Sequence, residues 1–222
     1  MFLPKAKKYF TSNLKEYLDN LKKIFNSIQE VSNSDVIIDS SKSPVYSYLL
    51  SLLDDVDLYV IHLIRDPRGV AYSRQKKMIQ PDKSNLLYME CYSSFKSSLL
   101  WDVRNITSEI MWGSKHEHYL KLKYEDFIEN PKNIVLQILK MLNLSPSKLP
   151  FISDDEVELG MNHSVWGNPS RFKVGKVKLK IDNEWKEKLN TKDRLISSVV
   201  TFPLLLKYGY SKLFEKRQSE ED

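Results

Sequence analysis

The sequence has 222 residues, a formal net charge of +5, 41% hydrophobic and 28% charged residues, values typical of one globular domain. The modest positive charge suits a small anionic ligand, whereas scattered lysines argue against nucleic acid as a partner. A single cysteine, Cys91, excludes an intramolecular disulfide and fits a reducing compartment, so we expect a cytoplasmic protein without a metal site. No apolar run approaches the roughly 18 residues of a membrane span, and the N-terminus lacks the apolar core of a signal peptide.

The first half of the chain is expected to alternate between helices and strands. Apolar residues at spacings of three and four predict an amphipathic helix over residues 5–31. A short β-branched run predicts a strand over residues 36–39, and residues 43–53 form the next helix. Residues 58–64 are almost all apolar, which favours a central strand of a parallel sheet with both faces buried.

The second half continues this pattern with longer helices. Residues 119–123 are the third expected strand, and residues 156–180 carry few periodic signals and are expected to be a loop. Alternating strands and helices imply a parallel sheet, although three strands are few for one. The remaining expected segments are helices over residues 67 to about 78, 84–112, 131–142, 183–189 and 193–207, and a frayed charged tail over residues 215–222.

The most informative segment is the end of the second expected strand. Arg65 lies where ligands of open α/β sheets bind, Asp66 is a good N-cap, and Pro67 suits the first helical position. Arg65 can offer a planar guanidinium to phosphate oxygens, and Ser73 can add a hydroxyl two turns into the helix. The alternative is a capped turn with solvated arginines. The whole pattern favours a phosphate site.

Residues 63–73 resemble the 3′-phosphate-binding segment of sulfotransferases that use PAPS (3′-phosphoadenosine 5′-phosphosulfate). The resemblance implies that Arg65 and Ser73 hold the 3′-phosphate of the nucleotide. It also implies an α/β, P-loop-NTPase-like three-layer fold with a parallel sheet, N-terminally incomplete. It extends over residues 35–210, so we expect a single domain over residues 1–214.

Two other segments match the same family. Residues 39–44 follow the first expected strand, and the family carries a lysine or histidine near the reacting group there, which makes Lys42 the candidate catalytic residue. A solvated lysine in a turn is the alternative. Residues 119–131 resemble a family segment whose tyrosine contacts adenine, so Tyr124 is a candidate for the nucleotide site. Glu125 and Asp126 are better explained as residues of a helix first turn than as an acid/base pair.

A further segment, residues 162–172, resembles the family's segment that closes over the nucleotide. The resemblance implies nucleotide contacts for Gly167, Asn168 and Arg171. His163 is more often structural than catalytic in such a position. His62 is in mid-strand and expected to be buried, so neither histidine is assigned as the general base.

One family feature is not found before residue 35: the strand and glycine-rich turn that cradles the 5′-phosphosulfate. Three explanations are open: a fragment, a degenerate remnant, or a loop supplied by another subunit. The resemblance implies sulfuryl transfer from PAPS to a hydroxyl or amine of a small-molecule or glycan acceptor, without a metal. One alternative is a non-catalytic module that binds an adenosine 3′-phosphate nucleotide. Another is a P-loop kinase-like enzyme, but the absence of the motif Gly-x-x-x-x-Gly-Lys-Ser/Thr argues against it.

Overall fold

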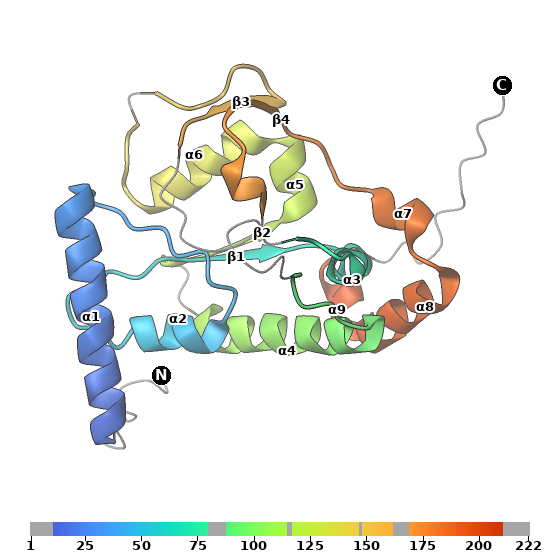
Figure 1. Ribbon diagram of the computed structural model, residues 1–222, viewed down its shortest axis with the longest axis horizontal. Coiled ribbons are helices and arrows are strands. Elements are labelled where there is room, and N and C mark those ends of the chain that lie inside the picture. Colours follow the sequence, from blue (N-terminus) through green and yellow to red (C-terminus); the bar gives the residue numbers. More distant parts are fainter. Residues whose placement is uncertain (1–10, 80–87, 115–116, 147, 162–168, 211–222) are drawn as a thin grey trace. The chain divides into compact units, whose positions relative to one another are not determined.

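The structure of the protein is a computed structural model that describes residues 11–79, 88–114, 117–146, 148–161 and 169–210 (Figure 1). The chain divides into two compact units, Met1–Val60 and Ile61–Asp222. Helices and a parallel pair of strands make the fold α/β, so the predicted class is confirmed. None of the described helices is long and apolar enough to cross a membrane. The single domain over residues 1–214 stays a prediction.

The first unit is built from two capped helices. α1 (Ser12–Ser32) begins after Thr11, whose side chain accepts a hydrogen bond from the Leu14 amide, and it ends at a left-handed Asn33. α2 (Pro44–Leu50) has Ser43 as its N-cap and proline at its first position. The buried residues of the two helices and the turn after them form one apolar cluster, made of Leu18, Leu21, Leu50 and Leu53.

The predicted strand over residues 36–39 is wrong. The described structure assigns these residues to no strand, and Val36 and Ile38 are 41% and 88% exposed. A β-branched run becomes a strand only when a neighbouring strand takes up its hydrogen bonds, and the described part of this unit contains no strand before β1.

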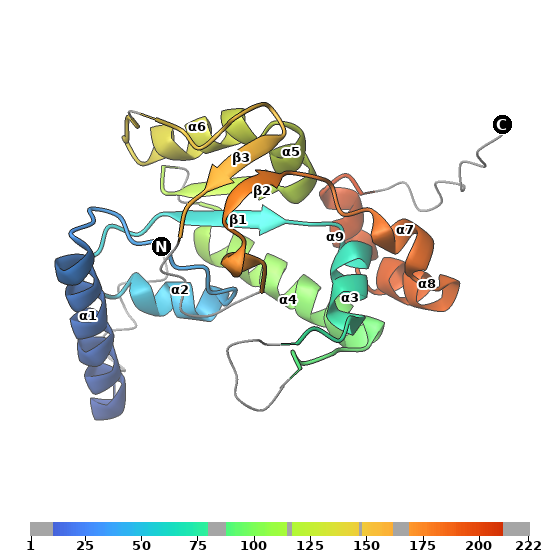
Figure 2. The same ribbon diagram turned by 45° about the horizontal axis from the view of Figure 1, so that its top comes forward.

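The second unit contains the sheet, in which β1 (Val60–Ile64) and β2 (Tyr119–Lys123) pair in parallel. The expectation that β1 is buried on both faces is wrong: Ile61 and Leu63 are 44% and 52% exposed, whereas His62 and Ile64 are buried. Figures 1 and 2 show α4 (Ser94–Trp112) running along one side of the strands. The buried His62 and Ile64 contact Asn105 and Trp101 of this helix, and Ile61 and Leu63 lie on the other, exposed face of β1.

The helices around the sheet begin and end where local signals place them. α3 (Pro67–Gln75) has Asp66 as its N-cap and ends three residues before the expected point. α4 begins at Ser94, because Ser93 caps it, and residues 88–93 are not helical. α6 (Pro131–Met141) starts with proline as predicted, directly after the short α5 (Tyr124–Glu129).

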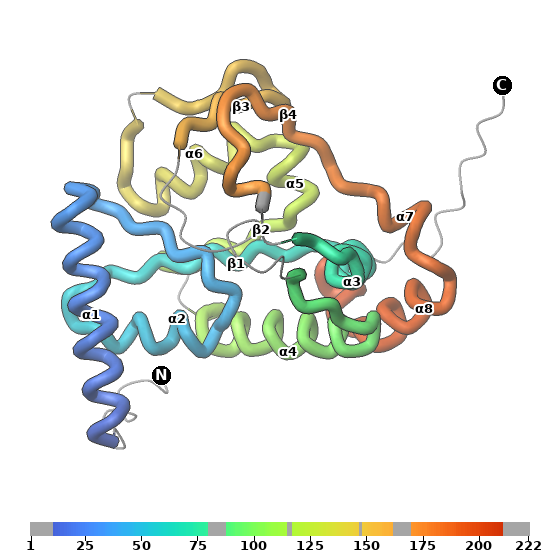
Figure 3. Tube along the Cα trace, in the orientation of Figure 1, coloured from blue at the N-terminus to red at the C-terminus, as the bar shows by residue number. Residues whose placement is uncertain are grey.

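The predicted loop over residues 156–180 is partly wrong. It contains an antiparallel pair, β3 (Glu156–Leu159) and β4 (Gly175–Lys178), and the 3₁₀ turn η2 (Pro169–Phe172). Each strand has four residues, and Val157 is the only buried one, so the alternation is too short to be recognised in the sequence. Figure 3 follows the chain from this hairpin to α7 (Glu184–Lys188) beside α3.

The last expected helix, residues 193–207, is two helices. α8 (Thr191–Val200) has Thr201 as its C-cap, and α9 (Phe202–Lys207) begins at the next residue. The helix is interrupted here because Pro203 has no N–H to donate to the preceding turn. α8 packs against α4, and both helices bury small hydroxyl side chains. The fully buried ones are Ser94 and Ser98 of α4, Ser197 of α8 and Thr201 at the C-cap of α8.

We predict that Asp102→Asn stabilises the protein at neutral pH and not at acidic pH. Asp102 lies on α4, its Oδ1 has no hydrogen-bond partner among the described residues, and burial raises the pKa of its carboxyl to about 6. The folded protein therefore binds this proton more tightly than the unfolded chain, whose aspartate pKa is about 3.9, and stability is lost as the pH rises from about 4 to 6. Allowing for solvent screening, we expect a gain of about 0.5–1 kcal/mol at pH 7.5 in urea unfolding.

The control for this experiment is Asp154→Asn, which neutralises an exposed carboxylate. It should change the free energy of unfolding equally little at pH 4.5 and at pH 7.5. A gain from Asp102→Asn of the same size at both pH values would contradict the assignment of a charged, poorly solvated carboxylate.

Candidate functional site

The site begins at the carboxyl end of β1. Arg65 directly follows the strand, and the Trp101 indole of α4 donates a hydrogen bond to the Arg65 carbonyl at 3.0 Å. The buried Ile64, Trp101 and Tyr208 pack together beneath this point. The strand end is therefore fixed from below by an apolar cluster and one hydrogen bond, and Arg65 extends from a rigid support.

A buried ion pair forms the turn that follows. Asp66 Oδ1 accepts from the backbone amide and Nε of Arg68, both at 2.9 Å, and Asp66 Oδ2 accepts from Arg68 Nη2 at 2.7 Å. The two side chains are 5% and 8% exposed. The Trp185 ring of α7 covers the guanidinium, with the Arg68 Cζ 4.7 Å from the ring centre. Arg68 is thus a structural residue, which the sequence pattern did not distinguish from the solvated arginines of a turn.

Gly69 lets α7 approach this turn closely. A Cβ at this position would lie 3.0 Å from Trp185 Cδ1 and 3.3 Å from Arg65 Nε. The glycine of the Arg-Asp-Pro-Arg-Gly pattern is therefore explained by packing of an indole against the first turn of α3.

Glu125 connects the end of β2 to the same turn. Its Oε1 accepts from the Asp66 amide at 3.3 Å, and its Oε2 accepts from the Tyr210 hydroxyl at 2.6 Å. Glu125 and Asp126 lie in the first turn of α5, as predicted. Burial, and then the Glu125 carboxylate, raise the pKa of the Tyr210 phenol above its ordinary value. Glu125 is fully engaged in holding the turn, so it is not an acid/base residue.

The structure brings two of the predicted site residues together. The Arg65 guanidinium lies over the Tyr124 ring, with its Cζ 4.7 Å from the ring centre. Asp182, which the sequence analysis missed, pairs with Arg65 Nη2 at 3.0 Å and donates its amide to the Tyr124 hydroxyl at 3.4 Å. No sequence signal marks Asp182, because it lies 117 residues from Arg65.

Ser73 and Arg171 are placed less fully. Ser73 lies in α3 and is half-buried, and its hydroxyl has no hydrogen-bond partner among the described residues. Arg171 lies in η2, with its Cζ 4.4 Å from the Phe172 ring centre. Gly167, Asn168 and His163 lie outside the described residues. The nucleotide contacts expected of Ser73, Gly167, Asn168 and Arg171 stay predictions.

Lys42 belongs to the first unit. It is an exposed residue just before α2, in a turn where Asp39 Oδ1 accepts from the Ser41 amide at 2.7 Å. Arg65 belongs to the second unit, and the catalytic role of Lys42 stays a prediction.

His62 is a buried structural residue, as expected. Asn105 donates its side-chain amide to the Trp101 carbonyl, so its Oδ1 accepts from His62 Nε2 at 2.7 Å. His62 Nδ1 then accepts from the Tyr119 hydroxyl at 2.6 Å. Burial lowers the pKa of the imidazole below its ordinary value. His62 is therefore neutral, joins α4 to both strands, and has no nitrogen left for a substrate.

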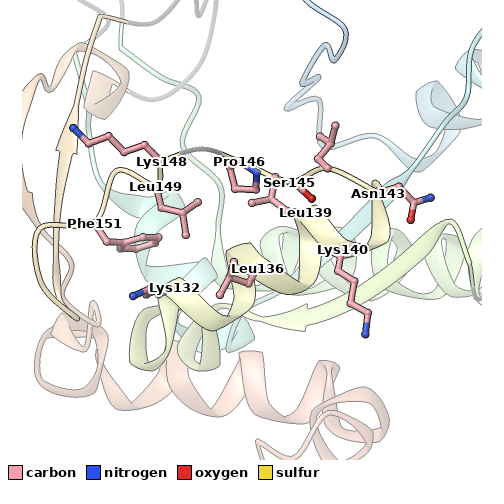
Figure 4. A pocket seen from close by; sticks show the side chains of 11 residues that line it. Lys132, Leu136, Leu139, Lys140, Asn143, Ser145, Pro146, Lys148, Leu149 and Phe151 are labelled. Atoms are coloured by element: carbon pink, nitrogen blue, oxygen red, sulfur yellow. The ribbon is translucent and has the colours of Figure 1, made fainter.

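A cavity of about 760 Å³ lies elsewhere in the second unit (Figure 4). It is lined by α6 and the segment after it, with Leu136 and Leu139 on one wall. Lys132 and Lys148 extend near Phe151 at one end, and Lys140 points away. None of the predicted site residues lines it, so this cavity is separate from the Arg65 site.

We predict that Asp66→Ala lowers the free energy of unfolding by about 3–5 kcal/mol, because it leaves the buried Arg68 guanidinium without its carboxylate and uncaps α3. Urea unfolding measures the change. The matched control is Asp155→Ala, which removes an exposed partner of Lys178 and should cost less than about 1 kcal/mol. Equal losses of unfolding free energy in the two variants would show that the buried pair contributes no more to stability than the exposed pair.

Comparison with known proteins places the chain in a family. The model of the sulfotransferase domain matches residues 7–198, which is most of the chain. No significant match is found among curated proteins or among solved structures. The α/β arrangement with a parallel strand pair agrees with the P-loop-like fold of that domain. The resemblance predicted from residues 63–73 is confirmed, and the chain belongs to the sulfotransferase domain family.

Proposed function

We propose that the protein binds PAPS and transfers its sulfuryl group to a hydroxyl or amine of a small-molecule or glycan acceptor. The family supports sulfuryl transfer in general. The observation that carries the proposal is the Arg65 guanidinium, which lies at the carboxyl end of β1 over the ring of Tyr124. A cation and an aromatic ring side by side match a nucleotide that carries both a phosphate and a base.

Side chains, rather than the α3 N-terminus, are the anion ligands in this proposal. Pro67 has no N–H, the Arg68 amide is bonded to Asp66, and the Arg68 guanidinium is buried. The first turn of α3 therefore has little to offer an anion. The Arg65 side chain is 22% exposed, and Ser73 has a hydroxyl without a described partner. We assign the 3′-phosphate to Arg65 and Ser73, and the adenine to Tyr124.

The other assignments follow from the family resemblance. Gly167, Asn168 and Arg171 would close over the nucleotide, and Lys42 would stabilise charge on the oxygen between sulfuryl group and leaving phosphate. By analogy with phosphoryl transfer, catalysis would rest on positioning and charge stabilisation, with no metal required. His62 takes no part, since both of its nitrogens are hydrogen-bonded inside the protein.

A second function is favoured by one sequence fact. No glycine precedes Gly69, so residues 1–68 contain no glycine-rich turn that could cradle a 5′-phosphosulfate. A chain with the Arg65 site and without this cradle would bind an adenosine 3′-phosphate nucleotide and transfer nothing.

Two measurements on one sample separate the functions. One is thermal stabilisation by 3′,5′-adenosine bisphosphate, and the other is turnover of PAPS against a broad panel of acceptors. Stabilisation with turnover supports the transferase. Stabilisation without turnover supports the binding module, and no stabilisation at millimolar nucleotide would count against both.

We predict that Arg65→Ala weakens binding of 3′,5′-adenosine bisphosphate at least about tenfold, because it removes a charge-assisted contact of roughly 1.5–3 kcal/mol. Isothermal titration calorimetry measures the affinity. Arg104→Ala, which removes an arginine of α4 outside the proposed site, is the control and should leave affinity unchanged. Unchanged affinity in Arg65→Ala would remove this residue from the nucleotide site.

A further inference from the structure

The guanidinium proposed to bind phosphate already holds a carboxylate. Arg65 Nη2 donates to Asp182 Oδ2 at 3.0 Å and to the Asp182 carbonyl at 3.2 Å. Asp182 lies just before α7, in a segment far from Arg65 in the sequence. Its carboxylate therefore occupies the group on which the nucleotide site depends.

The nitrogen that Asp182 occupies is the one that matters most. A guanidinium can bind an anion through two bidentate edges, one formed by Nε and Nη2 and the other by Nη1 and Nη2. Both edges include Nη2, which has one hydrogen for each edge, and Asp182 places two acceptors on this nitrogen, its Oδ2 and its carbonyl oxygen. While both acceptors are bound there, Arg65 can offer a phosphate only single contacts from Nε or Nη1. A bidentate phosphate contact requires Asp182 to leave.

The contact is built so that it can be exchanged. The side chains of Arg65 and Asp182 are 22% and 33% exposed, and ion pairs within reach of water contribute little stability. The Arg68–Asp66 pair beside it is nearly fully buried by comparison. Replacing Asp182 by another anion therefore costs little and leaves the turn after β1 intact.

We propose that Asp182 is an intramolecular competitor of the nucleotide, whose 3′-phosphate displaces the carboxylate from Arg65. The inference rests on the proposed function. Two other hydrogen bonds change when Asp182 leaves: its amide donates to the Tyr124 hydroxyl at 3.4 Å, and its Oδ1 accepts from the Glu184 amide at 3.2 Å. Displacement thus releases residues 181–184 and the Tyr124 hydroxyl together. Trp185 remains packed on Arg68 and confines the change to this short segment.

The first test is the affinity for 3′,5′-adenosine bisphosphate of the wild type and Asp182→Asn, measured by titration calorimetry. Asparagine keeps the shape and the oxygen that accepts from Glu184, but it removes the charge. We expect roughly two- to fivefold tighter binding, the equivalent of a partly exposed ion pair. Asp155→Asn, in the exposed pair with Lys178, is the matched control and should bind like the wild type.

If Asp182→Asn binds the bisphosphate with equal or weaker affinity than the wild type, Asp182 does not compete with the nucleotide. A loss of affinity as large as that of Arg65→Ala would show that Asp182 orients Arg65 for binding instead. If neither the wild type nor Asp182→Asn binds, the proposed function fails and the inference fails with it. If Asp182→Asn melts well below the wild type, Asp182→Ser, which can still accept from the Glu184 amide, replaces it in the same titration.

The second test is hydrogen exchange of the wild type with and without the bisphosphate. Displacement predicts faster exchange of the Asp182 and Glu184 amides on binding, because both lose the partners that they have in the structure. Slower exchange of these two amides would show that Asp182 stays on Arg65 in the complex, which overturns the inference while leaving the proposed function standing.

Discussion

The buried ion pair between Asp66 and Arg68 is the constraint on which the rest of the site depends. Removing two charges from water is costly, and the cost is met only where geometry and additional hydrogen bonds are good. Here Asp66 accepts three hydrogen bonds from a residue two positions away, and an indole covers the guanidinium. The pair fixes the path of the chain from strand to helix. It also separates the roles of two neighbouring arginines, because Arg68 is used inside the protein and Arg65 remains partly exposed.

The site is formed where four distant segments meet this turn. Glu125 arrives from the end of β2, Tyr210 from the chain after α9, Trp101 from α4, and Asp182 from the start of α7. The first three hold the backbone through buried or half-buried hydrogen bonds, which are stronger in a low-dielectric environment than in water. Of these four, only Asp182 contacts the guanidinium of Arg65, which also lies over the Tyr124 ring. The support is thus rigid, while the ion pair at the binding group is open to exchange.

Local signals predicted much of the fold, because a cap or a proline acts on its own neighbours. The start of α3 at Pro67, the start of α6 at Pro131 and both ends of β2 agree with the sequence analysis. The failures involve partners far away in the sequence. Residues 36–39 have strand composition without a neighbouring strand, and β3 and β4 become strands only by pairing with each other. For the same reason Asp182 could not be found, since nothing near it in the sequence indicates an arginine across the fold.

The difference between the two carboxylates has a consequence for ligand choice. Displacing Asp66 would leave the buried guanidinium of Arg68 without its carboxylate. Displacing Asp182 is less costly, because the ion pair between Arg65 and Asp182 is partly exposed to water. An anion that replaces Asp182 must interact with Arg65 more strongly than a singly charged carboxylate does. A phosphate monoester, with a charge of about −1.5 to −2 at neutral pH and three acceptor oxygens, meets this condition. A nucleotide with a 3′-hydroxyl does not. Competition by Asp182 would therefore make Arg65 selective for a terminal phosphate over other anions. The selectivity would lower the affinity for the nucleotide to some extent.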